Sequence, residues 1–151
     1  MMIKIFFCAV AILISTQVRA NLGSTEDSVD SDRKAIAGSE LETVHQGKFK
    51  VRTIQNHSLK IREYINPQGR VFGLAWDGAR HPNLETFLGH EYHSDFSQAI
   101  QNQKYGPGRR AFDLVRGQHV IVERSGHMRG MRGKAYVPEM FPQGVTAYDI
   151  K

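Results

Sequence analysis

The stretch that decides the fold is Leu59-Lys60-Ile61-Arg62-Glu63-Tyr64-Ile65-Asn66-Pro67-Gln68-Gly69-Arg70-Val71-Phe72-Gly73-Leu74-Ala75-Trp76. Apolar and polar side chains alternate in its first seven residues, which is the period of a half-buried strand. Residues 66–69 then have turn chemistry, because Asn supplies a side-chain acceptor, Pro presets φ and Gly ends the turn. Residues 70–76 predict the return strand, with Phe72, Leu74 and Trp76 on one face of a sheet. The stretch therefore predicts a β-hairpin.

Further strands flank this hairpin in the sequence. Residues 49–54 alternate apolar and polar side chains in the same way. Residues 112–116 and 119–124 predict a second hairpin across Gly117-Gln118, and residues 134–137 predict one more short strand.

One helical segment lies between the two hairpins. Asn83 can cap a helix that carries Leu84, Leu88, Tyr92 and Phe96 on one stripe. Gly89 can end this helix, or a single longer helix can continue to the glycines near residue 106. Strands, helix and strands in this order predict the α+β class, as a single small domain. We expect a mostly antiparallel sheet, built from hairpins, with the helix packed on one face.

The N-terminus has the features of a secretory signal peptide over residues 1–20. Lys4 precedes an apolar run over residues 5–14, and Val18-Arg19-Ala20 predicts cleavage after Ala20. The run is too short to span a bilayer, so we expect no transmembrane span after cleavage and a periplasmic or secreted location. An uncleaved membrane anchor is the alternative. Cys8 is the only cysteine, so the mature chain would have no thiol.

Composition indicates one globular domain. The chain has 151 residues, of which 40% are hydrophobic and 23% charged, with a formal net charge of +5. Residues 21–47 are polar and acidic, and we interpret them as a flexible spacer. The α+β domain is then expected over residues 48–151, and it is basic enough to favour anionic partners.

Three blocks of the sequence resemble the bacterial family called domain of unknown function 2844. The most specific is the hairpin block, Arg62 to Pro67 followed by Gly69 to Gly78. The other two are Pro82-Asn83-Leu84 with Leu88-Gly89 and Tyr92, and the C-terminal Ser125 to Arg129, Gly133 to Pro138 and Pro142 to Val145. The resemblance implies an exported protein from a Gram-negative-type bacterium, and it implies no activity.

The main candidate binding site is a basic, glycine-rich segment near residues 125–133, interpreted as a loop. Arginine can bind phosphate or carboxylate through two parallel hydrogen bonds, so this segment could hold an acidic envelope component or an acidic protein. A solvated hairpin rim is the alternative. Nucleic acid is not expected, because the protein is exported and an aromatic stacking set is missing. The residues of this candidate site are Arg124, His127, Arg129, Arg132 and Lys134.

Catalytic patterns are weaker. His81, His90 and His93 lie near Glu85 and could form a metal site, but His-Glu-x-His lacks the one-turn spacing of the zinc-hydrolase motif. Ser125 lacks the glycine that precedes the nucleophile of a serine-hydrolase elbow. A buried Glu63 would need a partner such as arginine, which favours a structural ion pair.

We therefore predict an exported, non-enzymatic accessory or binding module that needs no cofactor and acts through the basic loop or a sheet edge. The alternative is a small periplasmic hydrolase with a His/Glu metal site or a serine nucleophile.

Overall fold

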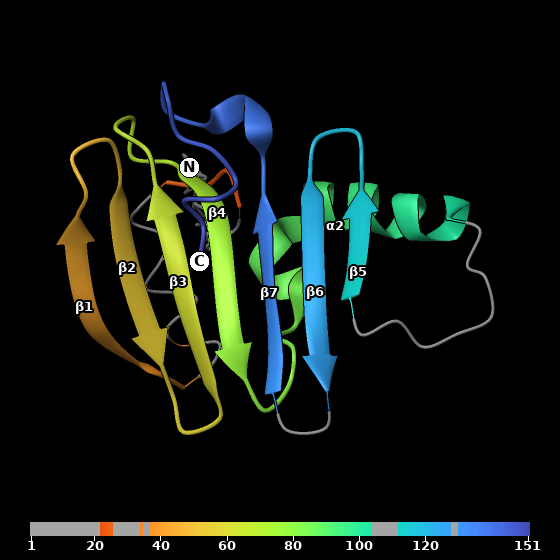
Figure 1. The fold of residues 1–151 in the computed structure, drawn as a ribbon, viewed down its shortest axis with the longest axis horizontal. Helices are drawn as coiled ribbons and strands as arrows, with labels where there is room; N and C mark the ends of the chain where they lie inside the picture. Colours follow the sequence, from red (N-terminus) through yellow and green to blue (C-terminus); the bar gives the residue numbers. More distant parts are fainter. Residues whose placement is uncertain (1–21, 26–33, 35–36, 104–111, 128–129) are drawn as a thin grey trace, which may run out of the picture.

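The computed structural model describes residues 22–25, 34, 37–103, 112–127 and 130–151. Within these residues the chain forms one seven-stranded antiparallel sheet and one long helix (Figure 1). The strands are β1 (Ser39–His45), β2 (Lys50–Gln55), β3 (Leu59–Ile65), β4 (Val71–Gly78), β5 (Phe112–Arg116), β6 (Ile121–His127) and β7 (Gly130–Tyr136). The helix is α2 (Leu84–Asn102), and a 3-10 turn, η2 (Pro138–Met140), follows β7.

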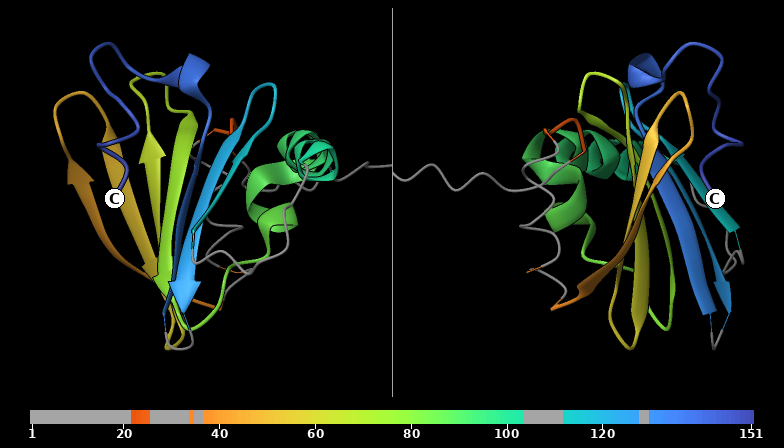
Figure 2. Two further views of the ribbon diagram at one scale, coloured as in Figure 1. Left: turned by 45° about the vertical axis from the view of Figure 1, so that its right-hand side comes forward. Right: turned by 90° about the vertical axis from the view of Figure 1, so that its left-hand side faces the viewer.

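The strand order is β1-β2-β3-β4-β7-β6-β5. The first four strands form a meander, α2 crosses one face, and the last three strands return so that β7 pairs with β4. Figure 2 shows α2 on one side of the sheet and residues 138–151, here called the C-terminal segment, on the other. The predicted α+β class, with its antiparallel sheet and a helix on one face, is confirmed. No helix in the described ranges is long and apolar enough to cross a membrane.

The central hairpin is formed as predicted, by β3 and β4. The side-chain oxygen of Asn66 accepts hydrogen bonds from the backbone N–H groups of Gln68 (3.1 Å) and Arg70 (3.0 Å). Gly69 has φ +74°, which glycine adopts at little cost. The turn is therefore stabilised by the residue types that predicted it.

The prediction that Phe72 shares a face with Leu74 and Trp76 is wrong. Tyr64 pairs with Gly73 and Ile65 pairs with Val71, so Phe72 is the extra residue of a β-bulge. Phe72 consequently packs on the face of the C-terminal segment, whereas Leu74 and Trp76 pack on the helix face. All three side chains are buried, so each face of the sheet has its own apolar core.

The sequence left open whether the helix ends at Gly89 or continues, and α2 has both a break at Gly89 and a continuation to Asn102. The side chain of Asn83 caps its start by accepting the N–H of Glu85 at 3.0 Å. Gly89 has φ +74° and kinks the helix without ending it. Phe87, Leu88 and Phe96 are buried against the sheet, which fixes both halves of the helix.

The sheet begins before residue 48, where the domain boundary was expected. Strand β1 and the buried side chain of Leu22 both lie within the stretch interpreted as a spacer. The N–H of Leu22 donates to Phe87 at 3.0 Å. Because β1 is an edge strand with exposed side chains at Glu42, Thr43 and Val44, its sequence has little of the apolar alternation that marks an inner strand.

The segment interpreted as a glycine-rich loop is instead formed by the facing ends of β6 and β7. Only residues 128 and 129, between these strands, lie outside the described residues. Gly133 is opposite Trp76 in register, and a Cβ at this position would collide with the indole ring. The glycine therefore makes room for an aromatic ring that crosses the strand, rather than marking a loop.

Candidate binding groove

A shallow groove of about 450 Å³ lies on the face of the sheet that the C-terminal segment only partly covers. Its floor is formed by β4, β7 and β6, and Ile150 and Lys151 border it from the C-terminal segment. We call it the sheet-face groove.

Strand register brings one row of side chains into this groove. Asp77, Arg132, Ser125 and Phe112 are paired in turn across β4, β7, β6 and β5. Residues that are directly opposite one another point to the same face of a sheet, so the row crosses the floor from an ion pair to an aromatic ring. Arg132 Nε lies 2.6 Å from Asp77 Oδ2, and 74% of the arginine side chain is exposed.

A second row lies between the first row and the C-terminal segment. It contains Arg62, Lys134 and Glu123, with the buried Ala75 between Arg62 and Lys134. Lys134 Nζ donates to the carbonyl of Ala147 at 2.7 Å and lies 3.6 Å from Glu123 Oε2. The lysine is therefore held between a groove carboxylate and the C-terminal segment.

Two tyrosines anchor the inner wall of the groove. The hydroxyl of Tyr136 donates to Glu123 Oε1 at 2.8 Å, and burial together with this bond raises the pKa of Tyr136. The hydroxyl of Tyr64 donates to the backbone oxygen of Lys151 at 2.9 Å, and Arg62 Nε donates to the same oxygen at 2.5 Å. The two bonds to Lys151 hold the end of the C-terminal segment at the groove margin.

Comparison with known proteins identifies the family. A family profile described as protein of unknown function DUF2844 matches residues 18–150. The chain belongs to the DUF2844 family. No curated protein and no solved structure matches it.

The DUF2844 chain brings two of the five predicted binding residues together. Arg132 and Lys134 are two positions apart on β7 and line the groove. Arg124 also borders the groove, but its side chain points to the helix face, where it pairs with Asp113 and lies 5.4 Å from the centre of the Phe96 ring. The side chain of His127, and Arg129 entirely, lie outside the described residues.

The binding site predicted from the sequence did not include several residues that line the groove, among them Arg62, Asp77, Phe112 and Glu123. They come from β3, β4, β5 and β6, and they meet only because β7 pairs with β4 across a long sequence separation. Alternation places each side chain on one face of its own strand, but it does not specify which strands are neighbours. A basic cluster in the sequence is therefore an incomplete guide to this site.

The histidines of the alternative metal site have separate environments. His81 Nδ1 accepts a hydrogen bond from the indole of Trp76 at 2.9 Å, and burial, then the charge of Arg124, lowers the pKa of His81. His90 is exposed after the kink, and the ring of His93 lies 6.3 Å from that of Phe96. Within the described part of the chain, no group of three His, Cys, Asp or Glu side chains could hold a metal ion.

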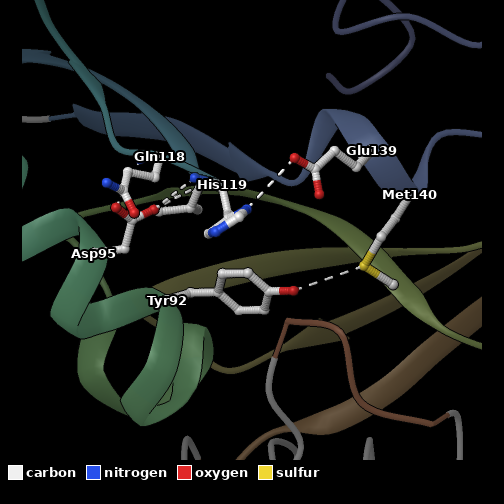
Figure 3. A network of polar contacts seen from close by, with 7 residues as sticks. Tyr92, Asp95, Gln118, His119, Glu139 and Met140 are labelled. Carbon is white, nitrogen blue, oxygen red and sulfur yellow. Dashed lines mark hydrogen bonds and ion pairs between the residues drawn. The ribbon is translucent and has the colours of Figure 1, made fainter.

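A separate polar network joins α2 to the hairpin of β5 and β6 (Figure 3). The carboxylate of Asp95 accepts three consecutive backbone N–H groups, those of Gln118 (2.7 Å), His119 (2.8 Å) and Val120 (3.0 Å). The turn is thus centred on Gln118 and His119, one residue later than predicted, and β6 begins at Ile121. Burial alone would raise the pKa of Asp95, but these hydrogen bonds outweigh it and lower the pKa.

Proposed function

We propose that this DUF2844 protein is an exported, non-enzymatic binding module that holds an anionic partner of the cell envelope in the sheet-face groove. The observation that carries the proposal is the charge of the groove. Five basic residues border it, and the side chain of one of them, Arg124, points to the helix face instead. The other four, Arg62, Arg132, Lys134 and Lys151, face two acidic residues, Asp77 and Glu123. Such an excess of positive charge favours anionic ligands and speeds their association.

The groove is a better candidate than either edge of the sheet. Strand β1 has a bulge between Glu40 and Glu42, and bulges and charges discourage the addition of another strand. Strand β5 has only five residues, and the side chain of Gln103 already donates to its Leu114 carbonyl at 2.8 Å. Both edges therefore have features that oppose β-strand addition.

The ionisable groups of the groove also favour binding over catalysis. General acid–base catalysis needs a group whose pKa lies near the working pH. The pKa of Tyr136, whose hydroxyl donates to Glu123, is raised further from neutrality. Arg132 pairs with Asp77 through Nε, and because 74% of its side chain is exposed, its other guanidinium N–H groups can reach an anionic ligand.

Binding to washed bacterial envelopes tests the proposal. The mature protein should co-sediment with envelopes at low salt and be released as the salt concentration rises, because exposed charges are screened. The double variant Arg62→Gln/Arg132→Gln should bind about tenfold more weakly, as expected for the loss of two charge-assisted contacts.

The matched control is Arg70→Gln. Arg70 is exposed and precedes β4, at the opposite end of this strand from Asp77. The substitution removes a positive charge without changing the groove, so binding should be unchanged. A loss in Arg70→Gln about half as large as that of the double variant, on the scale of binding free energy, would be equal per charge removed. It would mean that net charge, and not the groove, determines binding.

Export is a separate part of the proposal, and it rests on the apolar run at residues 5–14 and on Val18-Arg19-Ala20. Expression in a Gram-negative host, followed by cell fractionation and mass spectrometry, should give a periplasmic or secreted chain that begins at Asn21. An intact N-terminus in the cytoplasm would contradict export and leave the binding test unaffected.

A further inference from the structure

An exposed aromatic side chain lies at one end of the sheet-face groove. Three large apolar side chains are exposed in the described part of the chain, at Val44, Phe112 and Tyr148. Phe112 is 52% exposed and lies in the same cross-strand row as Arg132, at the β5 end of the groove. Tyr148 is 86% exposed and follows Ala147, whose carbonyl accepts the hydrogen bond from Lys134. Phe112 thus lines the groove, whereas Tyr148 is not one of the lining residues.

The groove also contains hydrogen-bond acceptors that a purely anionic ligand could not use. Asp77 and Glu123 are carboxylates on its floor, beside Arg132 and Lys134. A carboxylate accepts hydrogen bonds and repels other anionic groups, phosphate and carboxylate alike, at short range. A well-matched ligand must therefore supply both an acidic group for the cations and hydroxyl or N–H donors for the carboxylates.

The backbone beneath the groove has no hydrogen bonds to offer. Strands β4, β7 and β6 each have a paired neighbour on both sides. An extended peptide recognised through its main chain requires a free strand edge, which a sheet face does not provide. A ligand on this face must be recognised by side chains alone.

From these three observations we infer that the groove binds an acidic oligosaccharide, a sugar chain that bears carboxylates. Its carboxylates would bind Arg132, Lys134 and Arg62, and its hydroxyl groups would donate to Asp77 and Glu123. The apolar face of a sugar ring would pack on Phe112, because aromatic rings offer a large and rigid contact area. This inference rests on the proposed function and names the ligand class of the same site.

Isothermal titration calorimetry with the mature protein tests the inference. The probes are tetramers of galacturonic acid and of mannuronic acid and a hyaluronan fragment of similar length. Galactotetraose is the neutral control, since it replaces each carboxylate of the galacturonate chain with a hydroxymethyl group. We expect at least one acidic probe to bind, with galactotetraose at least tenfold weaker.

Two variants locate the site. Arg132→Gln and Phe112→Ser change exposed side chains and should each weaken binding of the acidic sugar about threefold to tenfold. Arg70→Gln should leave the affinity unchanged. Acidic-sugar binding that none of the groove variants alters would overturn the inference, because the sugar would then be bound elsewhere.

Two other probes separate this inference from the proposed function. They are vesicles containing phosphatidylglycerol and a tetra-aspartate peptide. If either probe binds the wild-type protein and binds Arg132→Gln more weakly, while no acidic sugar binds, the sugar inference is wrong and the groove remains an anion site. If no anionic probe binds and the envelope experiment is also negative, both proposals are wrong.

Discussion

At the scale of single residues, the least expected contact joins Gly133 to Trp76. The indole ring of Trp76 lies across β7 at Gly133, and its N–H donates a hydrogen bond to His81 Nδ1. A glycine in a central strand lacks a side chain to pack, and here the neighbouring aromatic ring fills that space. Glycine at position 133 is therefore required by packing in the helix-face core, directly beneath the groove floor.

Gly133→Ala should destabilise the protein by about 1–3 kcal/mol, the usual cost of inserting a methyl group into a full space. The new Cβ would meet both the indole of Trp76 and the backbone oxygen of Glu123. Urea unfolding gives the free energy. Gly130→Ala is the control in the same strand, since a Cβ there meets nothing within 4 Å. Equal stability of the two variants would contradict this packing.

Trp76 is the only tryptophan, so its fluorescence reports the bond to His81. The pKa of His81 lies below its usual value of 6.5 in the folded protein, which therefore binds fewer protons than the unfolded chain. The contribution of neutral His81 to stability is complete above pH 6.5 and decreases as the pH falls from there toward the folded pKa. We expect a fluorescence transition below pH 6.5 in folded protein, and His81→Phe should abolish it.

At the scale of secondary-structure elements, the sequence predicted local features well and non-local ones poorly. The Asn66 turn and the Asn83 cap are fixed by neighbouring residues, and both are present. The bulge at Phe72 and the pairing of β4 with β7 depend on packing between distant segments, and no local pattern encodes them. The candidate site shows the same division, because Arg132 and Lys134 were identified from one segment and Phe112 was not.

The Asp95 carboxylate joins α2 to the hairpin of β5 and β6 through three backbone hydrogen bonds. Asp95→Asn has one acceptor oxygen in place of two and no charge, so it should lower stability by about 1–2 kcal/mol at pH 7. The pKa of Asp95 is lowered in the folded protein, so its contribution is present above about pH 3.8 and is lost as the pH falls through the folded pKa. Unfolding curves of the two proteins should therefore converge in acid.

Glu91→Gln is a suitable control for this experiment, since Glu91 is exposed on the same helix. It should change stability by less than about 0.5 kcal/mol. A stability difference between wild type and Asp95→Asn that is constant from pH 7 to pH 3 would contradict the role of the charge.

At the scale of the whole molecule, the sheet is covered on both faces by segments of very different kinds. Helix α2 covers the half that contains β5, β6 and β7, behind these strands in Figure 1, and the C-terminal segment covers the other face. On that face an aromatic cluster of Phe49, Tyr64, Phe72 and Tyr136 is closed by Phe141 and Ile150. The groove is the part of this face that the C-terminal segment leaves uncovered. The edge of the apolar cluster is therefore also the margin of the groove.

Ile150 lies at this boundary. It is buried over Gly73 and also lines the groove, directly before Lys151, whose backbone oxygen binds Arg62 and Tyr64. Ile150→Ala should lower stability by about 2–4 kcal/mol through the cavity it leaves. It should also weaken ligand binding, because Lys151 and Arg62 would lose their fixed positions.

Val145→Ala is the control. It removes a buried side chain from the same cluster without touching the groove, so it should reduce stability alone. Calorimetric titration of both variants under conditions where each is folded measures the difference, and equal affinities would mean that the C-terminal segment supports the fold but not the site.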